Sequence, residues 1–375
     1  MLKIGIVGLP NVGKSTLFNA LTKASVPAEN YPFCTIDPSV GIVGVPDARL
    51  EKLTKLSGSA KTIPAAIEFV DIAGLVKGAA EGEGLGNQFL ANIRETDAIL
   101  QVVRFFDDTN IVHVSSGGGS APGGDTVVEP FKDIEIINME LVLADAEQVR
   151  KRRDKIVGDI RSNDKKAIAE DAALVKLERA FSTGTFALHA GLADDEKKNI
   201  AHLNLLTMKP ILYALNKKSG GHNLDELADG RAERAYELIA SLGSRYVVVD
   251  AATERELNDV ADSDRQSLRQ EFGVSGDGLA DLIRGAYDTL GLISFFTTGK
   301  DETRAWTIPA GSAAPAAGAA IHNDFLEKFI RAEVVSTEDL LAAGSWAAAR
   351  ESAKVATCGK EYIVKDGDVI VFLHG

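Results

Sequence analysis

The sequence has no apolar run that approaches the roughly 20 residues needed to cross a bilayer, so we expect no membrane-spanning helix. It contains only two cysteines, Cys34 and Cys358, which lie far apart and lack metal-ligand spacing, so no disulfide framework is expected. Positive charge is scarce too. With 41 Lys and Arg against 54 Asp and Glu, the net charge is −13, which argues against a protein coated in basic charge for nucleic acid. No signal-peptide pattern precedes the first apolar run, so we expect a cytoplasmic protein.

The sequence does have enough apolar residues for a large core. With 375 residues, 45% of them hydrophobic, we expect two or three domains. Strand-like runs alternate with helical stretches, and this order predicts a mostly parallel sheet with helices on both faces, the α/β class. These runs span residues 4–7, 41–45, 67–70, 98–103, 211–215 and 246–249.

Three stretches depart from this alternation. Residues 115–124 are rich in Gly and Ser, and we expect a flexible loop there. Residues 134–206 are strongly charged with helical periodicity, which predicts two long antiparallel helices that project from the sheet domain. Downstream of Leu290, short β-rich runs at 305–308, 330–335, 362–364 and 369–372 predict a small separate α+β domain, in which residues 366–368 form a tight turn between two strands.

The most informative motif is a phosphate-binding loop directly after the first apolar run, with the sequence Gly8-Leu9-Pro10-Asn11-Val12-Gly13-Lys14-Ser15-Thr16. Its glycines let successive backbone N–H groups surround a polyphosphate, its lysine reaches the β and γ oxygens, and the next hydroxyl can ligate Mg²⁺. The helix that follows presents the positive end of its dipole there. We therefore expect nucleoside triphosphate binding, with Lys14 also acting in catalysis. The residues expected around the phosphates are Asn11, Val12, Gly13, Lys14, Ser15 and Thr16.

A second motif, Asp71-Ile72-Ala73-Gly74, follows the apolar run at 67–70. In phosphate-loop hydrolases an acidic residue at this point holds Mg²⁺ through water, and the glycine amide meets the γ-phosphate. Asp71 is therefore a candidate for the metal site and Gly74 for catalysis. Thr35 is a candidate switch threonine that ligates Mg²⁺ together with Ser15, and the alternative is an ordinary turn residue.

The attacking water has no glutamine to orient it, because Leu75 stands where small hydrolases of this class often place one. Another group must take that role. His113 is one catalytic candidate, although a lone histidine also serves as an ordinary surface or core residue. Asn11 is a candidate ligand for a monovalent cation such as K⁺.

A third motif, Asn216-Lys217-Lys218-Ser219, follows the apolar run at 211–215, where guanine-specific members of this class carry Asn-Lys-x-Asp. The aspartate accepts two hydrogen bonds from guanine, and a serine hydroxyl cannot replace that paired acceptance. We therefore expect Asn216 to contact the base and strong guanine selection to be lost at Ser219. The two lysines are equally compatible with a solvated loop.

Together these motifs resemble the YchF family, also called Obg-like ATPases, over nearly the whole chain. Other segments that carry the resemblance are residues 30–36, 69–76, 82–87 and 93–98, and, near the C-terminus, 304–307, 329–334 and 366–369. The resemblance implies an Obg-type nucleotide domain in two parts, at 1–132 and 207–288, a helical coiled-coil insertion at 133–206 and a ubiquitin-like TGS domain at 289–375. It also implicates the histidine that matches His113 in hydrolysis. Ser219, where the family has a glutamate, and Cys358, which also replaces a glutamate, depart from its pattern.

The function that this resemblance implies is slow, Mg²⁺-dependent ATP hydrolysis by a ribosome-associated switch in translation and stress responses. Two alternatives stay open: a GTPase switch of the same class, and a ribosome-binding scaffold whose nucleotide is structural and barely turned over. Partners would be ATP and the ribosome, including the rRNA of its large subunit, with no membrane. The helical insertion contains a basic run, Arg150-Lys151-Arg152-Arg153, together with Lys155, Arg161, Lys165 and Lys166. These side chains could meet RNA phosphates or form a solvated helix face.

Overall fold

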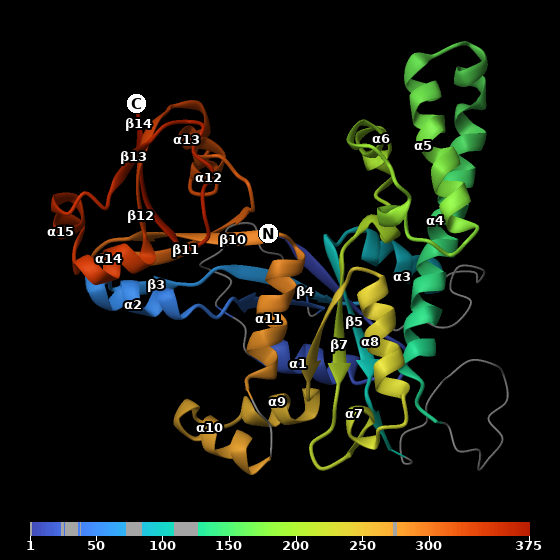
Figure 1. Ribbon diagram of the computed structural model, residues 1–375, viewed down its shortest axis with the longest axis horizontal. Helices are drawn as coiled ribbons and strands as arrows, with labels where there is room; N and C mark the ends of the chain where they lie inside the picture. The colour runs from blue at the N-terminus through green and yellow to red at the C-terminus, as the bar shows by residue number, and fades with distance from the viewer. Residues whose placement is uncertain are drawn as a thin grey trace.

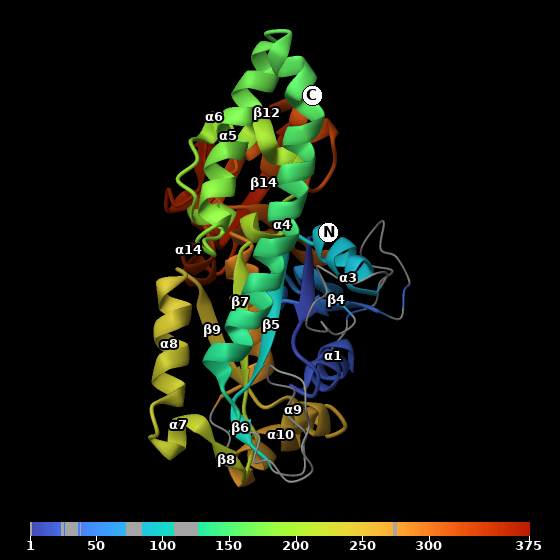
Figure 2. The same ribbon diagram turned by 90° about the vertical axis from the view of Figure 1, so that its right-hand side faces the viewer.

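The structure is a computed structural model that describes residues 2–23, 26, 37, 39–72, 85–108, 127–272 and 276–375. Figure 1 shows a central sheet with helices on both faces, a long helical pair that projects from it, and a second sheet formed mainly by C-terminal residues. Figure 2, turned by 90°, shows that the helical pair and the C-terminal part extend beyond the same end of the central sheet. No helix within these described ranges is both long enough and apolar enough to cross a bilayer.

The central sheet has six strands, in the order β2-β4-β1-β5-β7-β9. Five of them are parallel, and β2 at one edge is antiparallel to β4. Strands β5 and β7 are buried at every residue, as expected for central strands of a parallel sheet that is covered on both faces. The mostly parallel sheet predicted from the alternation of apolar runs is confirmed. The strands are β1 (Lys3–Val7), β2 (Val40–Gly44), β4 (Ala66–Asp71), β5 (Ala98–Arg104), β7 (Ile211–Asn216) and β9 (Arg245–Val249).

Helices cover both faces of this sheet (Figure 1). Helices α1 (Lys14–Lys23), α9 (Ala251–Leu257) and α11 (Gly278–Thr289) lie on one face, and α3 (Leu85–Arg94), α8 (Arg231–Ser241) and the first part of α4 lie on the other. The side chains of β7 alternate accordingly, because Leu212 faces α11 while the hydroxyl of Tyr213 approaches Asn138 of α4. Further helices of this part are α7 (Leu224–Leu227) and α10 (Asp262–Glu271).

The helical projection consists of α4 (Pro130–Arg161) and α5 (Lys165–Phe181), which confirms the expected antiparallel pair. Helix α4 first packs on the sheet through Ile134, Ile137 and Leu141 and then extends away from it. After α5 the chain returns through α6 (Asp194–Ile200) and short 3₁₀ turns. The buried carboxylate of Asp145 fixes this return, because it accepts hydrogen bonds from the backbone N–H groups of Leu206 and Thr207 at 3.0 and 2.8 Å.

The C-terminal part is a second six-stranded sheet, in the order β13-β12-β14-β10-β11-β3. The expected strands near 305–308, 330–335 and 369–372 are present, but the one expected at 362–364 is wrong. Ile363 makes only an isolated bridge to Ala313, and burial of Val364 explains the apolar pattern that suggested a strand. The strands are β3 (Lys61–Ile63), β10 (Leu292–Thr298), β11 (Glu302–Pro309), β12 (Phe329–Ser336), β13 (Ala356–Cys358) and β14 (Asp368–His374). The helices are α12 (Ala314–Ala319), α13 (Asp324–Glu327), α14 (Thr337–Ala343) and α15 (Trp346–Glu351).

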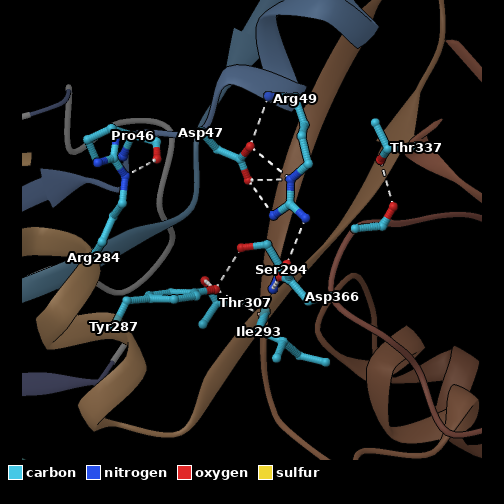
Figure 3. Close-up of polar contacts among 11 residues, drawn as sticks. Pro46, Asp47, Arg49, Arg284, Tyr287, Ile293, Ser294, Thr307, Thr337 and Asp366 are labelled. Carbon is cyan, nitrogen blue, oxygen red and sulfur yellow. Dashed lines mark hydrogen bonds and ion pairs between the residues drawn. The ribbon is translucent and has the colours of Figure 1, made fainter. Parts of the chain in front are cut away.

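The C-terminal sheet is not separate from the rest of the chain, because its edge strand β3 comes from the N-terminal part. Strand β3 pairs in parallel with β11, and helix α2 (Ala48–Ser57) directly precedes β3. Arg49 of α2 hydrogen-bonds to the Asp47 carboxylate and places Nη1 2.7 Å from Oδ2 of Asp366 (Figure 3). Gly367 has a φ of +88°, and a Cβ there would lie 2.7 Å from Arg49 Nη1. The α2–β3 segment therefore links the N-terminal part of the chain to the C-terminal sheet.

Candidate nucleotide-binding site

The phosphate-loop motif forms the tight turn between β1 and α1. Gly13 has a φ of +95° directly before the first residue of α1, and Asn11 has a φ of +64°. The backbone N–H of Leu17 donates to the Gly13 carbonyl at 2.9 Å, so the helix is regular from its first turn. A Cβ at Gly8 would lie 2.9 Å from the Val102 carbonyl of β5. The turn therefore needs glycine at two places, once for its conformation and once for its close approach to the sheet.

The first turn of α1 faces the end of β4. The ammonium of Lys14 lies 2.6 Å from Oδ1 of Asp71, the last residue of that strand. Both side chains are mostly shielded from solvent, whereas Ser15 is exposed and Thr16 is partly buried. The structure thus brings together the lysine expected at the phosphates and the carboxylate expected at the metal, 57 residues apart in the sequence.

Asn216, at the end of β7, joins three elements of the site. Its Nδ2 donates to the Val12 carbonyl at 2.9 Å, and its Oδ1 accepts from the Ala251 N–H at 3.0 Å. The side chain is buried, and a Cβ at Gly13 would lie 2.2 Å from Nδ2. The amide therefore fixes the phosphate loop to β7 and to the start of α9. Sequence reasoning assigned Asn216 to the base and missed these backbone contacts, because they cross between segments far apart in the chain.

The two lysines after Asn216 are both ion-paired. Lys217 Nζ lies 2.9 Å from Asp225 Oδ2 and 3.1 Å from Glu226 Oε1, while Lys218 Nζ lies 2.6 Å from Asp108 Oδ2. Burial opposes the positive charge on Lys217, but its hydrogen bonds to the two carboxylates outweigh this and raise its pKa. The ion pairs of Lys217 and Lys218 therefore hold the loop after β7 in place.

Several predicted site residues lie outside the described ranges: Thr35, Gly74, Leu75 and His113, together with the Gly-rich run at 115–124. Their roles stay predictions. Among the residues that the structure does describe, no three or more His, Cys, Asp or Glu side chains form a group suited to a metal ion. Predicted site residues that the structure does bring together are Asn11, Val12, Gly13, Lys14, Ser15, Thr16, Asp71 and Asn216.

Comparison with known proteins places the whole chain in one family. A Bacillus subtilis protein named ribosome-binding ATPase YchF is 48% identical over 375 residues, covering 99% of this chain and 98% of the relative. The chain belongs to the YchF family. An Escherichia coli O157:H7 relative with the same name is 46% identical over 371 residues, with 99% and 98% coverage.

Two family models and one solved structure agree with this assignment to the YchF family. A model described as 50S ribosome-binding GTPase matches residues 3–117, and the YchF-GTPase_C model, described as a protein of unknown function, matches residues 292–374. The structure of the Schizosaccharomyces pombe YchF GTPase superposes with a TM-score of 0.83 at 35% identity, covering 99% of this chain and 97% of the other. The YchF fold therefore extends over the full chain, including the helical projection and the C-terminal sheet.

Proposed function

We propose that this YchF protein is a magnesium-dependent ATPase that acts as a ribosome-associated nucleotide switch in the cytoplasm, with roles in translation and stress responses. The observation that carries the enzymatic part is the cluster of Gly13, Lys14, Asp71 and Asn216 around the start of α1. The ATPase and ribosome parts are supported by the names of relatives that match 99% of the chain.

The proposed reaction is attack of water on the γ-phosphorus, which releases phosphate and ADP. The loop amides and the Lys14 ammonium stabilise the charge that spreads over the phosphoryl oxygens, and the positive end of α1 adds to this field. The Gly74 amide would contact the γ-phosphate. Release of that phosphate after hydrolysis would remove this contact and change the conformation around Gly74. Since Leu75 cannot orient water, we assign that role to His113 or to a monovalent cation such as K⁺ at Asn11.

The residues present suit a magnesium ion. Ser15 is exposed in the first turn of α1, and Asp71 offers a partly exposed carboxylate 2.6 Å from the neighbouring Lys14 ammonium. Hydroxyl and carboxylate oxygens are the donors that Mg²⁺ prefers. Ser15 and Thr35 would ligate it, and Asp71 would hold one of its waters. The ion would neutralise charge on the β- and γ-phosphates.

Two aspects of the ribosome interaction are also part of the proposal. The basic run of α4 is partly neutralised within the projection, because Lys151, Arg152 and Arg153 pair with acidic side chains of α4 and α5. A contact with rRNA through the projection would therefore depend mainly on its other exposed basic side chains, Arg150, Lys155, Arg161, Lys165 and Lys166. Residues 289–375 would form the TGS domain, following nucleotide-domain segments at 1–132 and 207–288 and the coiled-coil insertion at 133–206.

A GTPase of the same design is the second candidate, since the fission-yeast structure carries that name. Ser219 argues against it, because its hydroxyl cannot accept both guanine donors. Equilibrium binding of the two triphosphates separates the candidates. Tighter binding of GTP by about tenfold, equivalent to about 1.4 kcal/mol, would replace ATP by GTP in the proposal.

Single-turnover phosphate release tests whether the protein is an enzyme or a scaffold. We expect Lys14→Ala to slow release by about 100-fold, the scale reported for removing one charge-stabilising donor. The matched control is Lys23→Ala, at the other end of α1, where an exposed ion pair with Asp259 contributes little. If wild type releases phosphate no faster than Lys14→Ala, even with ribosomes and K⁺ present, the scaffold alternative holds.

A further inference from the structure

The loop after β7 and the start of α9 share one buried carboxylate, that of Asp250. The backbone N–H of Ser219 donates to Asp250 Oδ2 at 2.6 Å, and the Thr253 hydroxyl donates to the same oxygen at 2.8 Å. The Thr253 hydroxyl also lies 3.2 Å from the Ser219 hydroxyl. The position at which guanine-specific proteins carry their aspartate is therefore occupied by a serine that lies next to a carboxylate from another strand end.

This carboxylate has no acceptor capacity left for a ligand. Its other oxygen, Oδ1, accepts from the backbone N–H groups of Ala252 and Thr253 at 3.1 and 3.0 Å, where Asp250 forms the N-cap of α9. Two oxygens with about four lone-pair sites thus accept four hydrogen bonds. Asp250 is only 9% exposed, so the four donors and the surrounding chain enclose it.

We infer that Asp250 is a specificity-determining, positioning residue for the nucleotide base, acting through Ser219. Its carboxylate accepts a hydrogen bond from the Ser219 backbone, and protein donors occupy all of its acceptor sites. The base then meets a neutral hydroxyl, which can both donate and accept, in place of a carboxylate. Such a hydroxyl suits adenine, whose edge has one donor and one acceptor, and leaves the two adjacent donors of guanine without a paired acceptor. This inference rests on the proposed triphosphate binding and names the group that selects the base.

Exchanging the two side chains tests the inference. In Ser219→Asp/Asp250→Ser the carboxylate moves to the loop while a hydroxyl, itself a favourable N-cap, remains at the start of α9. We expect the ratio of GTP affinity to ATP affinity to rise by about tenfold or more. In Ser219→Asp alone the new carboxylate would lie beside Asp250, so the two charges repel and the ratio should change by less than about threefold.

A second variant keeps the test decisive if the exchange impairs folding. Thr253→Val keeps a similar side-chain volume and the backbone caps but removes one donor to Asp250 Oδ2, the oxygen that also holds the Ser219 N–H. Ser219 should then be held less firmly, and the ratio should shift toward GTP by about threefold. Fluorescent ATP and GTP analogues measure both affinities in wild type and variants. If wild type binds neither nucleotide, the proposed function fails. If wild type binds ATP but neither the exchange nor Thr253→Val moves the ratio, or Ser219→Asp alone moves it fully, the role of Asp250 is refuted.

Discussion

The side chain of Asn216 offers the sharpest test of how the phosphate loop is held. In Asn216→Ala both hydrogen bonds of the amide are lost, at 2.9 Å to the Val12 carbonyl and at 3.0 Å from the Ala251 N–H. The two backbone groups stay buried without their partner. Each such group costs about 1–3 kcal/mol, so for the two together we expect the free energy of unfolding to fall by about 2–6 kcal/mol. ATP affinity should fall as well, because the loop amides that surround the phosphates lose their support.

Urea unfolding and fluorescent-ATP titration measure these two effects on the same samples. Asn216→Asp separates the two contacts, since it keeps an acceptor for Ala251 but turns an oxygen toward the Val12 carbonyl. It should weaken ATP binding nearly as much as Asn216→Ala. The matched control is Asn138→Ala on α4, whose buried side chain makes a single long hydrogen bond among the described residues, at 3.5 Å from the Tyr213 hydroxyl. If Asn216→Ala loses stability while ATP affinity stays within about twofold, a change near 0.4 kcal/mol, this reasoning is refuted.

Three further predictions concern the loop, the contact between the two sheets and the helical projection. Gly13→Ala should lower ATP affinity by at least about tenfold, since φ is +95° and the new Cβ would lie 2.2 Å from a side-chain amide; titration with a fluorescent analogue measures it. Arg49→Met should lower the free energy of unfolding by about 2 kcal/mol, because it removes the charged hydrogen bonds of Arg49 and its contact with the Phe296 ring. The control Arg284→Met, at an exposed ion pair, should change the free energy of unfolding by under about 0.5 kcal/mol; urea melts measure both. The pKa of Glu170 is lowered chiefly by its hydrogen bond from Arg152, so this pair stabilises the fold above the ordinary carboxyl pKa and loses its effect as pH falls through the lowered value. Wild type should therefore exceed Arg152→Met in melting temperature at neutral pH, and the difference should shrink as the pH is lowered below the ordinary carboxyl range; an unchanged difference would contradict the assignment.

The features that the sequence predicted best are those that depend on residues close together in the chain. The strands β1, β4, β5 and β7 are apolar runs buried between helices, and the phosphate loop is a contiguous motif whose glycines serve local geometry. The helical pair was also predictable, because charged and apolar residues repeat with helical periodicity over α4 and α5.

The features that sequence did not indicate depend on contacts between distant segments. Strand β3 has three residues, two of them exposed, so no apolar pattern marks it, and its partner β11 lies some 240 positions further along. Arg49 and Asp366 are 317 positions apart. Likewise, Ser219 alone suggested only a missing carboxylate, and the structure was needed to find Asp250 beside it, 31 positions later. Long-range partners of this kind carry no signal in a single sequence.

Calorimetric titration of the full chain with ATP in millimolar Mg²⁺, beside Lys14→Ala, tests the central claim most directly. The account predicts saturable binding of one ATP per chain, weakened at least about tenfold, or about 1.4 kcal/mol, in the variant. The account would be contradicted if wild type gave no binding heat with either ATP or GTP, or if wild type bound ATP no more tightly than Lys14→Ala.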